Sequence, residues 1–194
     1  MIEINGLTKR YGAKTIFENL SFCIEENKCT VFSGESGIGK TTLLRCIAGL
    51  ERPDAGSVNG ISGKKTSFVF QENRLIGHLS MLDNVLCVAP DRQRAEYFLE
   101  RVGLSAESGK KADELSGGMK RRLAIARSLS AGGELYFLDE PLRELDEGTE
   151  EKMLALLKEE LAGKTTFLIT HDSAHAAALA DNVLFFTGTP MHLK

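Results

Sequence analysis

One segment near the N-terminus constrains the fold of this chain more than any other. Residues 34–42 match the pattern G-x-x-x-x-G-K-[ST]. Its glycines let the backbone turn tightly, so that successive N–H groups point into one concavity that suits a phosphate. An apolar run at 29–32 precedes the segment, and a half-buried helical pattern at 42–48 follows it. Strand, loop and helix in this order predict an α/β fold with a nucleoside triphosphate site.

Every residue of this loop is a candidate nucleotide ligand. The side chain of Lys40 is expected to reach the β- and γ-phosphates, and the hydroxyl of Thr41 is expected to bind Mg²⁺. The helix that begins near Lys40 adds the positive end of its dipole. A chance glycine-rich turn is the alternative, and the flanking strand and helix disfavour it. The candidate ligands are Gly34, Glu35, Ser36, Gly37, Ile38, Gly39, Lys40, Thr41 and Thr42.

A second candidate segment is an apolar run at 135–138 that ends in two carboxylates, Asp139 and Glu140. Such a run is typical of a strand buried on both faces, and ligands of open α/β sheets bind where such strands end. Asp139 is the candidate for holding Mg²⁺ directly or through water, and Glu140 is the candidate for orienting and deprotonating an attacking water. A simple Asp-Glu helix cap is the alternative.

A Ser-Gly-Gly step at residues 116–118 opens a basic helical stretch at 119–130. Together with Leu138-Asp139-Glu140-Pro141, it resembles the nucleotide-binding domain of ATP-binding-cassette (ABC) proteins, over about residues 2–186. The resemblance implies an ATPase in which two domains pair head to tail. Each ATP then lies between one phosphate loop and the partner's Ser116, Gly117 and Gly118. The physical basis is that amides at a helix N-terminus make a second anion site.

The same resemblance implies roles for four further residues. Tyr11 is similar to the aromatic that stacks on adenine, although an ordinary half-buried strand tyrosine remains the alternative. Gln71 corresponds to the glutamine that joins Mg²⁺ and the water to the helical subdomain. His171 is similar to the histidine that contacts the γ-phosphate, where a structural histidine is the alternative. Asp146 resembles the aspartate of a loop that crosses the subunit interface.

The chain departs from the family pattern where two subunits should meet. Met119 stands where the family usually has glutamine, and Arg143 and Glu144 stand where small residues are usual. These changes leave open whether the chain pairs with itself or with a relative in a heterodimer. We interpret the basic residues of 119–130 as a solvated helix face rather than a nucleic-acid patch; they are Lys120, Arg121, Arg122 and Arg127.

Composition agrees with one domain, 1–194, whose helical subdomain spans about 72–130. The net charge is −3, which gives no basic bias towards nucleic acid. No apolar run approaches the roughly 18 residues that span a bilayer, and no signal peptide is visible. The cysteines have no metal-binding spacing, which favours a reduced, cytoplasmic compartment. We therefore expect attachment to the inner face of the membrane only through permease subunits, and no C-terminal regulatory domain.

The remaining pattern predicts a P-loop fold with a mixed or parallel core sheet, an N-terminal antiparallel β subdomain and a small helical subdomain. Expected strands are 2–8, 20–24, 28–32, 65–70, 134–138, 165–169 and 183–186. Expected helices are 82–88, 92–102, 119–130, 147–161 and 172–180. Turns are expected in the stretch before residue 65, at Gly56, Gly60 and Gly63.

The most concrete function is an ATP-hydrolysing subunit that powers a membrane transporter, because residues 71–89 resemble those of bacterial importers. In such importers this stretch forms a groove for a membrane subunit. Packing within the helical subdomain is an equal alternative for its apolar residues, which are Leu75, Ile76, Leu79, Met81, Leu82 and Val85. Two other functions stay open: a soluble ABC-type ATPase not coupled to transport, and a nucleotide-gated binding module that barely hydrolyses. The transported substrate and direction cannot be read from the residues.

Overall fold

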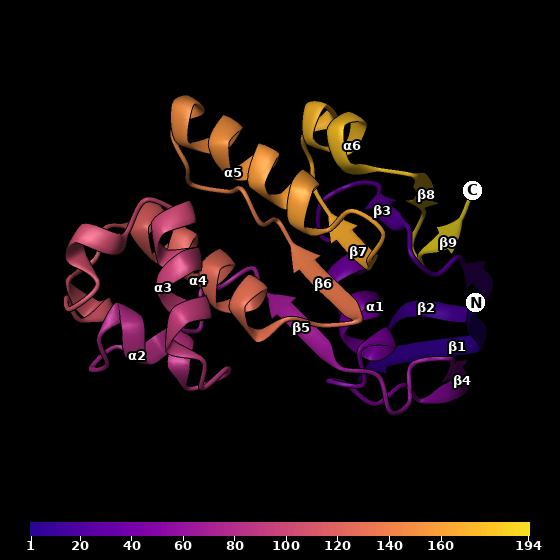
Figure 1. Cartoon of the computed structure of the whole chain (residues 1–194). Coiled ribbons are helices and arrows are strands. Elements are labelled where there is room, and N and C mark those ends of the chain that lie inside the picture. Colours follow the sequence, from indigo (N-terminus) through magenta and orange to yellow (C-terminus); the bar gives the residue numbers. More distant parts are fainter.

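The computed structural model describes all 194 residues and divides into a core sheet, an antiparallel sheet and a helical part (Figure 1). The strands are β1 (Ile2–Tyr11), β2 (Lys14–Ile24), β3 (Cys29–Ser33), β4 (Ala55–Asn59), β5 (Thr66–Val69), β6 (Leu135–Asp139), β7 (Thr165–Ile169), β8 (Asn182–Thr187) and β9 (His192–Leu193). The α-helices are α1 (Lys40–Ile47), α2 (Met81–Leu86), α3 (Arg92–Arg101), α4 (Gly117–Ala131), α5 (Glu147–Glu160) and α6 (Ser173–Leu179). Two short 3₁₀ helices, η1 (Ser105–Glu107) and η2 (Ala112–Glu114), precede α4.

The core sheet has the strand order β5-β6-β7-β3-β8-β9. Its pairs are parallel except for β8 with β9, which confirms the expected mixed sheet. Alternate residues of β6 enter two different cores. Phe137 packs on the side of α1, where its ring stacks on Phe167 at 4.6 Å, and Leu138 packs on the side of α4 and α5. Burial on both faces explains why this strand is a continuous apolar run.

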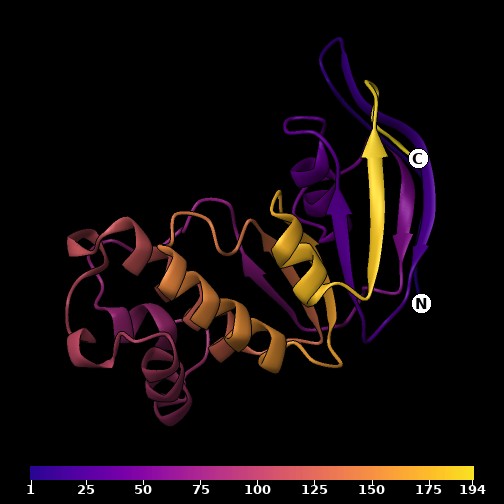
Figure 2. The same cartoon turned by 90° about the horizontal axis from the view of Figure 1, so that it is seen from above.

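The antiparallel sheet has the order β2-β1-β4 and lies beside the N-terminus (Figure 2). Its first two strands are longer than expected, and the interpretation of Gly56 as a turn was wrong, because it lies within Ala55–Asn59. These residues form β4, which pairs with β1. Gly56 is the reason that the pairing is possible, because a side chain there would lie 2.5 Å from the carbonyl of Gly6. The glycine allows close backbone contact within a strand.

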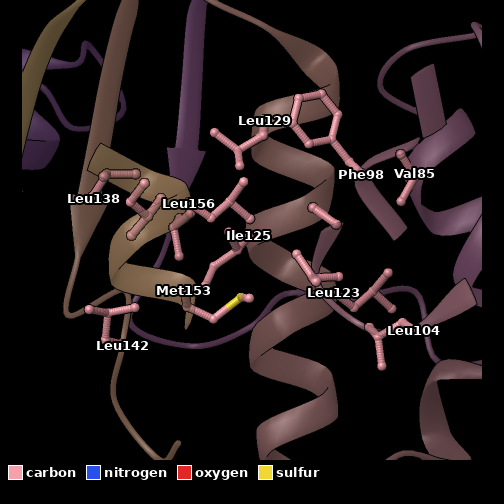
Figure 3. Close-up of a cluster of buried hydrophobic side chains, with 14 of the residues drawn as sticks. Val85, Phe98, Leu104, Leu123, Ile125, Leu129, Leu138, Leu142, Met153 and Leu156 are labelled. Carbon is pink, nitrogen blue, oxygen red and sulfur yellow. The ribbon is translucent and has the colours of Figure 1, made fainter. Parts of the chain in front are cut away.

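The helical part is organised around α4, which packs against α2 and α3 on one side and α5 and β6 on the other. Figure 3 shows this core: Phe98 and Leu104 face α4 from the helical part, and Leu142, Met153 and Leu156 face it from the side of β6 and α5. Because α4 packs on two sides, it has two apolar faces, and few of its residues are exposed to solvent.

The interpretation of the basic residues of α4 as a solvated face was wrong. Arg121 is buried, and Lys120, Arg122 and Arg127 are half-buried. Their guanidinium groups donate to backbone carbonyls: Arg122 to Val102 and Gly103, and Arg127 to Asn73 and Arg74. Arginine bonds of this kind satisfy buried carbonyls at loop and helix ends, which the pattern of charges alone did not reveal.

Two apolar residues of the expected groove instead fill the helical core. Met81 and Val85 are fully buried, as the packing alternative requires. Leu75, Leu79 and Leu82 are half-buried, and Ile76 is exposed. Separately, none of the helices is both long and apolar enough to span a lipid bilayer.

Candidate nucleotide site

The phosphate loop joins the end of β3 to the start of α1, as the sequence predicts. Gly34 has a φ of 142°, and a Cβ there would lie 2.3 Å from the carbonyl oxygen of Phe186 in β8. Only glycine permits this approach, which presses the loop against the sheet. The N-terminus of α1 is thereby fixed at the carboxyl ends of the parallel strands, where ligands of such sheets bind.

Lys40 is the first residue of α1, and its side chain folds back onto the phosphate loop. The residue is 4% exposed. Its ammonium group donates to the carbonyl oxygens of Gly34 at 2.7 Å and Glu35 at 2.6 Å. Burial lowers the pKa of Lys40, and the carboxylates of Glu140 and Asp139 oppose that shift. The loop therefore holds a buried positive charge beside an anion site.

An oxygen pair lies next to this charge. The hydroxyl of Thr41 donates to a carboxylate oxygen of Asp139 at 2.8 Å. Burial raises the pKa of Asp139, and the bond from Thr41 acts in the opposite direction. Carboxylate and hydroxyl oxygens in contact are the ligand types that Mg²⁺ prefers. This is the metal half of the predicted site.

Glu140 follows β6 in a left-handed turn with a φ of 51°. Its N–H donates to the carbonyl oxygen of Ile169 at 2.9 Å, which ties the turn to the end of β7. Oε1 of Glu140 is 3.4 Å from Nε2 of His171 but accepts no hydrogen bond from the protein. Burial raises the pKa of Glu140, and its interactions with His171 lower it in part. A buried carboxylate oxygen without a donor is suited to accept a proton from a bound water.

These residues surround a single cavity of about 440 Å³. It brings together residues from the phosphate loop, β5, β6 and β7 that lie far apart in the sequence. Gln71 lines it from the end of β5, and Arg143 lines it although we did not predict a ligand role there. In the sequence Arg143 stands out only as a departure from the family pattern. The full lining is Ser36, Gly37, Gly39, Lys40, Thr41, Thr42, Gln71, Asp139, Glu140, Arg143, Ile169 and His171.

Tyr11 lies outside this lining, near the end of β1. The residue is 49% exposed, and its hydroxyl donates to the carboxylate of Glu51. The Lys9 ammonium lies 5.1 Å from the ring centroid. The ring is thus held by neighbouring polar groups while much of its surface is free. This exposure does not match a half-buried strand tyrosine.

The Ser-Gly-Gly step also lies outside the cavity lining. Ser116 is the N-cap of α4, where its hydroxyl accepts the N–H of Met119 at 3.3 Å. Ser116 and Gly117 are exposed, and a Cβ on Gly117 would lie 3.6 Å from a carboxylate oxygen of Glu144. The step therefore presents a free helix N-terminus at the surface. One chain therefore carries both candidate anion sites but does not bring them together.

Asp146 is the N-cap of α5, and its carboxylate accepts the N–H of Thr149 at 3.1 Å. The bonds from Thr149 lower the pKa of Asp146. Because Asp146 is exposed, its cap geometry fixes the loop before α5 without burying it. The loop is free to contact another chain.

The fold and this cavity define a nucleotide-binding protein of the P-loop class. A family model described as "ABC transporter" matches residues 17–143. The aliphatic sulfonates import ATP-binding protein SsuB 3 of Paraburkholderia xenovorans is 40% identical over 188 residues, which cover 94% of this chain and 75% of that protein. The phosphonates import ATP-binding protein PhnC of Fusobacterium nucleatum is 35% identical, with 95% of this chain and 87% of that protein covered.

Solved structures agree with these relatives. The dimeric structure of MJ0796, a bacterial ABC transporter cassette, matches with a TM-score of 0.90 at 30% identity, covering 100% of this chain and 97% of that one. A post-hydrolysis state of the same cassette bound to ADP and Pi matches with a TM-score of 0.87 at 28% identity, with the same coverage of each chain. The chain belongs to the ABC transporter family. The expected role as an ATP-binding and ATP-hydrolysing protein is confirmed.

Proposed function

We propose that this chain is the ATPase subunit of a bacterial importer and that the cavity between the phosphate loop and Glu140 holds Mg·ATP. The observation that carries the proposal is the convergence of Lys40, Asp139, Glu140 and His171 on one cavity. Loop amides and Lys40 bind the β- and γ-phosphates. Electrostatic stabilisation by preorganised donors is the largest contribution to catalysis of this kind.

The residues present fit a magnesium ion. Thr41 and Asp139 form an oxygen pair at 2.8 Å, and Gln71, which lines the same cavity, can add an amide oxygen. When bound, the ion supplies positive charge that neutralises the charge developing on the β- and γ-phosphates. The burial-raised pKa of Asp139 is consistent with a site that gains from a cation.

Glu140 acts as the base in this mechanism. Its carboxylate orients a water for in-line attack on the γ-phosphorus and accepts the proton that the water loses. Its raised pKa makes it a better proton acceptor than an exposed carboxylate. His171, whose Nε2 lies 3.4 Å from Glu140, contacts the γ-phosphate from the end of β7. Tyr11 stacks on the adenine from the end of β1.

Assembly completes the site. Two chains pair head to tail, so that Ser116, Gly117 and Gly118 of one close on the γ-phosphate held by the other, and Asp146 lies in the shared interface. The dimeric cassette among the structural neighbours supports pairing. ATP binding closes the pair, hydrolysis reopens it, and the motion drives permease subunits at the inner face of the membrane. The names of the curated relatives, which are import ATP-binding proteins, support this coupling over a soluble ATPase.

The direct test is the variant Glu140→Gln. It keeps the side chain's shape but removes the base, so we expect ATP binding to persist while phosphate release slows at least about 10²-fold. We also expect ATP to hold this variant as a dimer in size-exclusion chromatography. Wild-type turnover in the variant would remove Glu140 from the mechanism. Very slow phosphate release by the wild type would instead favour a nucleotide-gated binding module.

Coupling to a membrane needs a separate test. Affinity purification from detergent-solubilised membranes should recover a protein with several membrane spans together with this chain. Recovery of the chain alone, with full ATPase activity, would favour the soluble ATPase.

A further inference from the structure

Arg121, in α4, is the most extensively bonded side chain that the proposed mechanism does not use. It is 2% exposed. Its Nε donates to the carbonyl oxygen of Pro141 at 2.9 Å, and its Nη1 donates to that of Phe70 at 2.6 Å. Its Nη2 donates to the carbonyl oxygen of Asp139 at 3.0 Å. Further acceptors are the carbonyl oxygens of Gln71 and Glu140 and the side chain of Asn73.

All of these acceptors lie where β5 and β6 end. The backbone that Arg121 holds therefore carries Gln71, Asp139 and Glu140, which line the cavity. A planar guanidinium with a fixed fork of donors can hold neighbouring strand ends at a set separation, and it keeps its charge when buried. Arg121 itself does not line the cavity, so it touches the backbone of these residues from behind.

The turn at Glu140 is the position most dependent on this contact. Its φ of 51° lies in a region that non-glycine residues sparsely populate. Such conformations persist only where the surroundings fix them. The N–H of Glu140 donates to Ile169, and its carbonyl oxygen accepts from Arg121 and, at 3.2 Å, from the backbone N–H of Arg143. Without Arg121 the turn can relax, and the carboxylate then moves away from His171.

We propose that Arg121 is a positioning residue for hydrolysis, which fixes the turn of Glu140 and the end of β5 at Gln71. The proposal rests on the proposed function of the cavity. Arg121 makes no hydrogen bond to the phosphate loop, so it governs turnover rather than the binding of ATP. It also joins these strand ends to α4, the helix that begins after Ser116. A single buried side chain therefore links the two anion sites of one chain.

The test compares Arg121→Met with Arg122→Met, a matched control on the same helix. Arg122 also donates to carbonyls, at 2.8 Å to Val102 and 3.0 Å to Gly103, but these lie at the end of α3. For Arg121→Met we expect kcat to fall at least about 10-fold while KM for ATP changes less than about 3-fold. For Arg122→Met both constants should stay within about 2-fold of the wild type.

A second variant, Arg121→Lys, keeps the positive charge but loses the planar set of guanidinium N–H donors. Its kcat should lie between those of Arg121→Met and the wild type, with KM unchanged. If circular dichroism shows that Arg121→Met is unfolded, the test relies on Arg121→Lys alone. A lower kcat with an unchanged KM in that variant then supports the proposal. Wild-type kcat in the folded Arg121 variants, or an equal loss in Arg122→Met, overturns the proposal. Absent ATPase activity in the wild type would instead refute the proposed function.

Discussion

Burial of the Glu140 carboxylate, the proposed base, affects the stability of the folded protein. Burial raises its pKa above the ordinary value of 4.5, so the folded protein binds this proton more tightly than the unfolded chain does. The resulting contribution to stability is fully present below pH 4.5 and is lost as the pH rises through the folded-state pKa. At neutral pH the nucleotide-free protein therefore carries an unfavourable buried charge.

Replacing this charge should stabilise the protein. We expect Glu140→Gln, without nucleotide, to raise the free energy of unfolding at about pH 7.5 by roughly 0.5–2 kcal/mol, as is common when a strained functional group is removed. The gain should shrink as the pH falls through 4.5 and vanish well below it, where the wild-type carboxyl is protonated in both states. Urea denaturation at a series of pH values measures this difference. The exposed Glu151→Gln is the control and should show no such trend; a Glu140→Gln protein less stable than the wild type at pH 7.5 would contradict the prediction.

At the N-terminus of α4 one side chain, Ser116, combines a structural role as the helix cap with a proposed role in nucleotide binding. Ser116→Ala removes the cap bond to the N–H of Met119, which should lower stability by about 1 kcal/mol. The proposed contact with the partner's nucleotide disappears with the same hydroxyl. We therefore expect a loss of ATP turnover beyond what the loss of stability explains, with turnover measured by phosphate release.

A cap elsewhere separates the two roles. Asp91 caps α3 by accepting the N–H of Arg94 at 3.0 Å, and it lies far along the chain from any candidate ligand. Asp91→Ala should lower the melting temperature about as much as Ser116→Ala while leaving turnover unchanged. Equal losses of turnover in both variants would mean that Ser116 acts only as a cap.

Elements that depend on local pattern could be predicted, and those that depend on distant contacts could not. The helices begin and end within two residues of expectation, because the apolar spacing along a helix is a local signal. β4 was missed because Gly56 reads as a turn until its pairing with β1 is known. The environment of Arg121 was missed for the same reason: a basic residue on a helix is read as exposed unless its carbonyl acceptors are visible.

The residues of the candidate site also fall into those that the sequence predicts and those that it does not. The phosphate loop and the Asp139-Glu140 step are contiguous motifs, so their residues were named from the sequence, and the structure places Lys40, Thr41, Asp139, Glu140, His171 and Gln71 around one cavity. Arg143 was flagged only as a departure from the family pattern. Its place in the cavity wall depends on how the turn after β6 folds, which no spacing rule specifies.

In the whole molecule the two proposed anion sites, the phosphate loop and the Ser-Gly-Gly step, do not meet within one chain. Pairing can therefore be tested without a structure of the complex. Lys40→Ala disables a chain's own phosphate loop, and Ser116→Arg blocks the site that it offers to a partner. Each variant alone should be inactive, because both interfaces of its symmetric pair contain a defect. In a mixed pair, one interface contains both the altered phosphate loop and the altered Ser116, and the other interface contains neither.

Mixing the two variants in equal amounts should therefore restore ATP hydrolysis, to roughly a quarter of the wild-type rate, because about half of the pairs are mixed and each has one sound interface. Tagging one variant and co-purifying the other would show that mixed pairs form. If mixed pairs form and no activity returns at saturating ATP, either the nucleotide does not lie between two copies or both sites must act together. Mixing wild type with the doubly altered Lys40→Ala, Ser116→Arg chain separates these cases. There every mixed interface contains one defect, so only wild-type pairs should remain active.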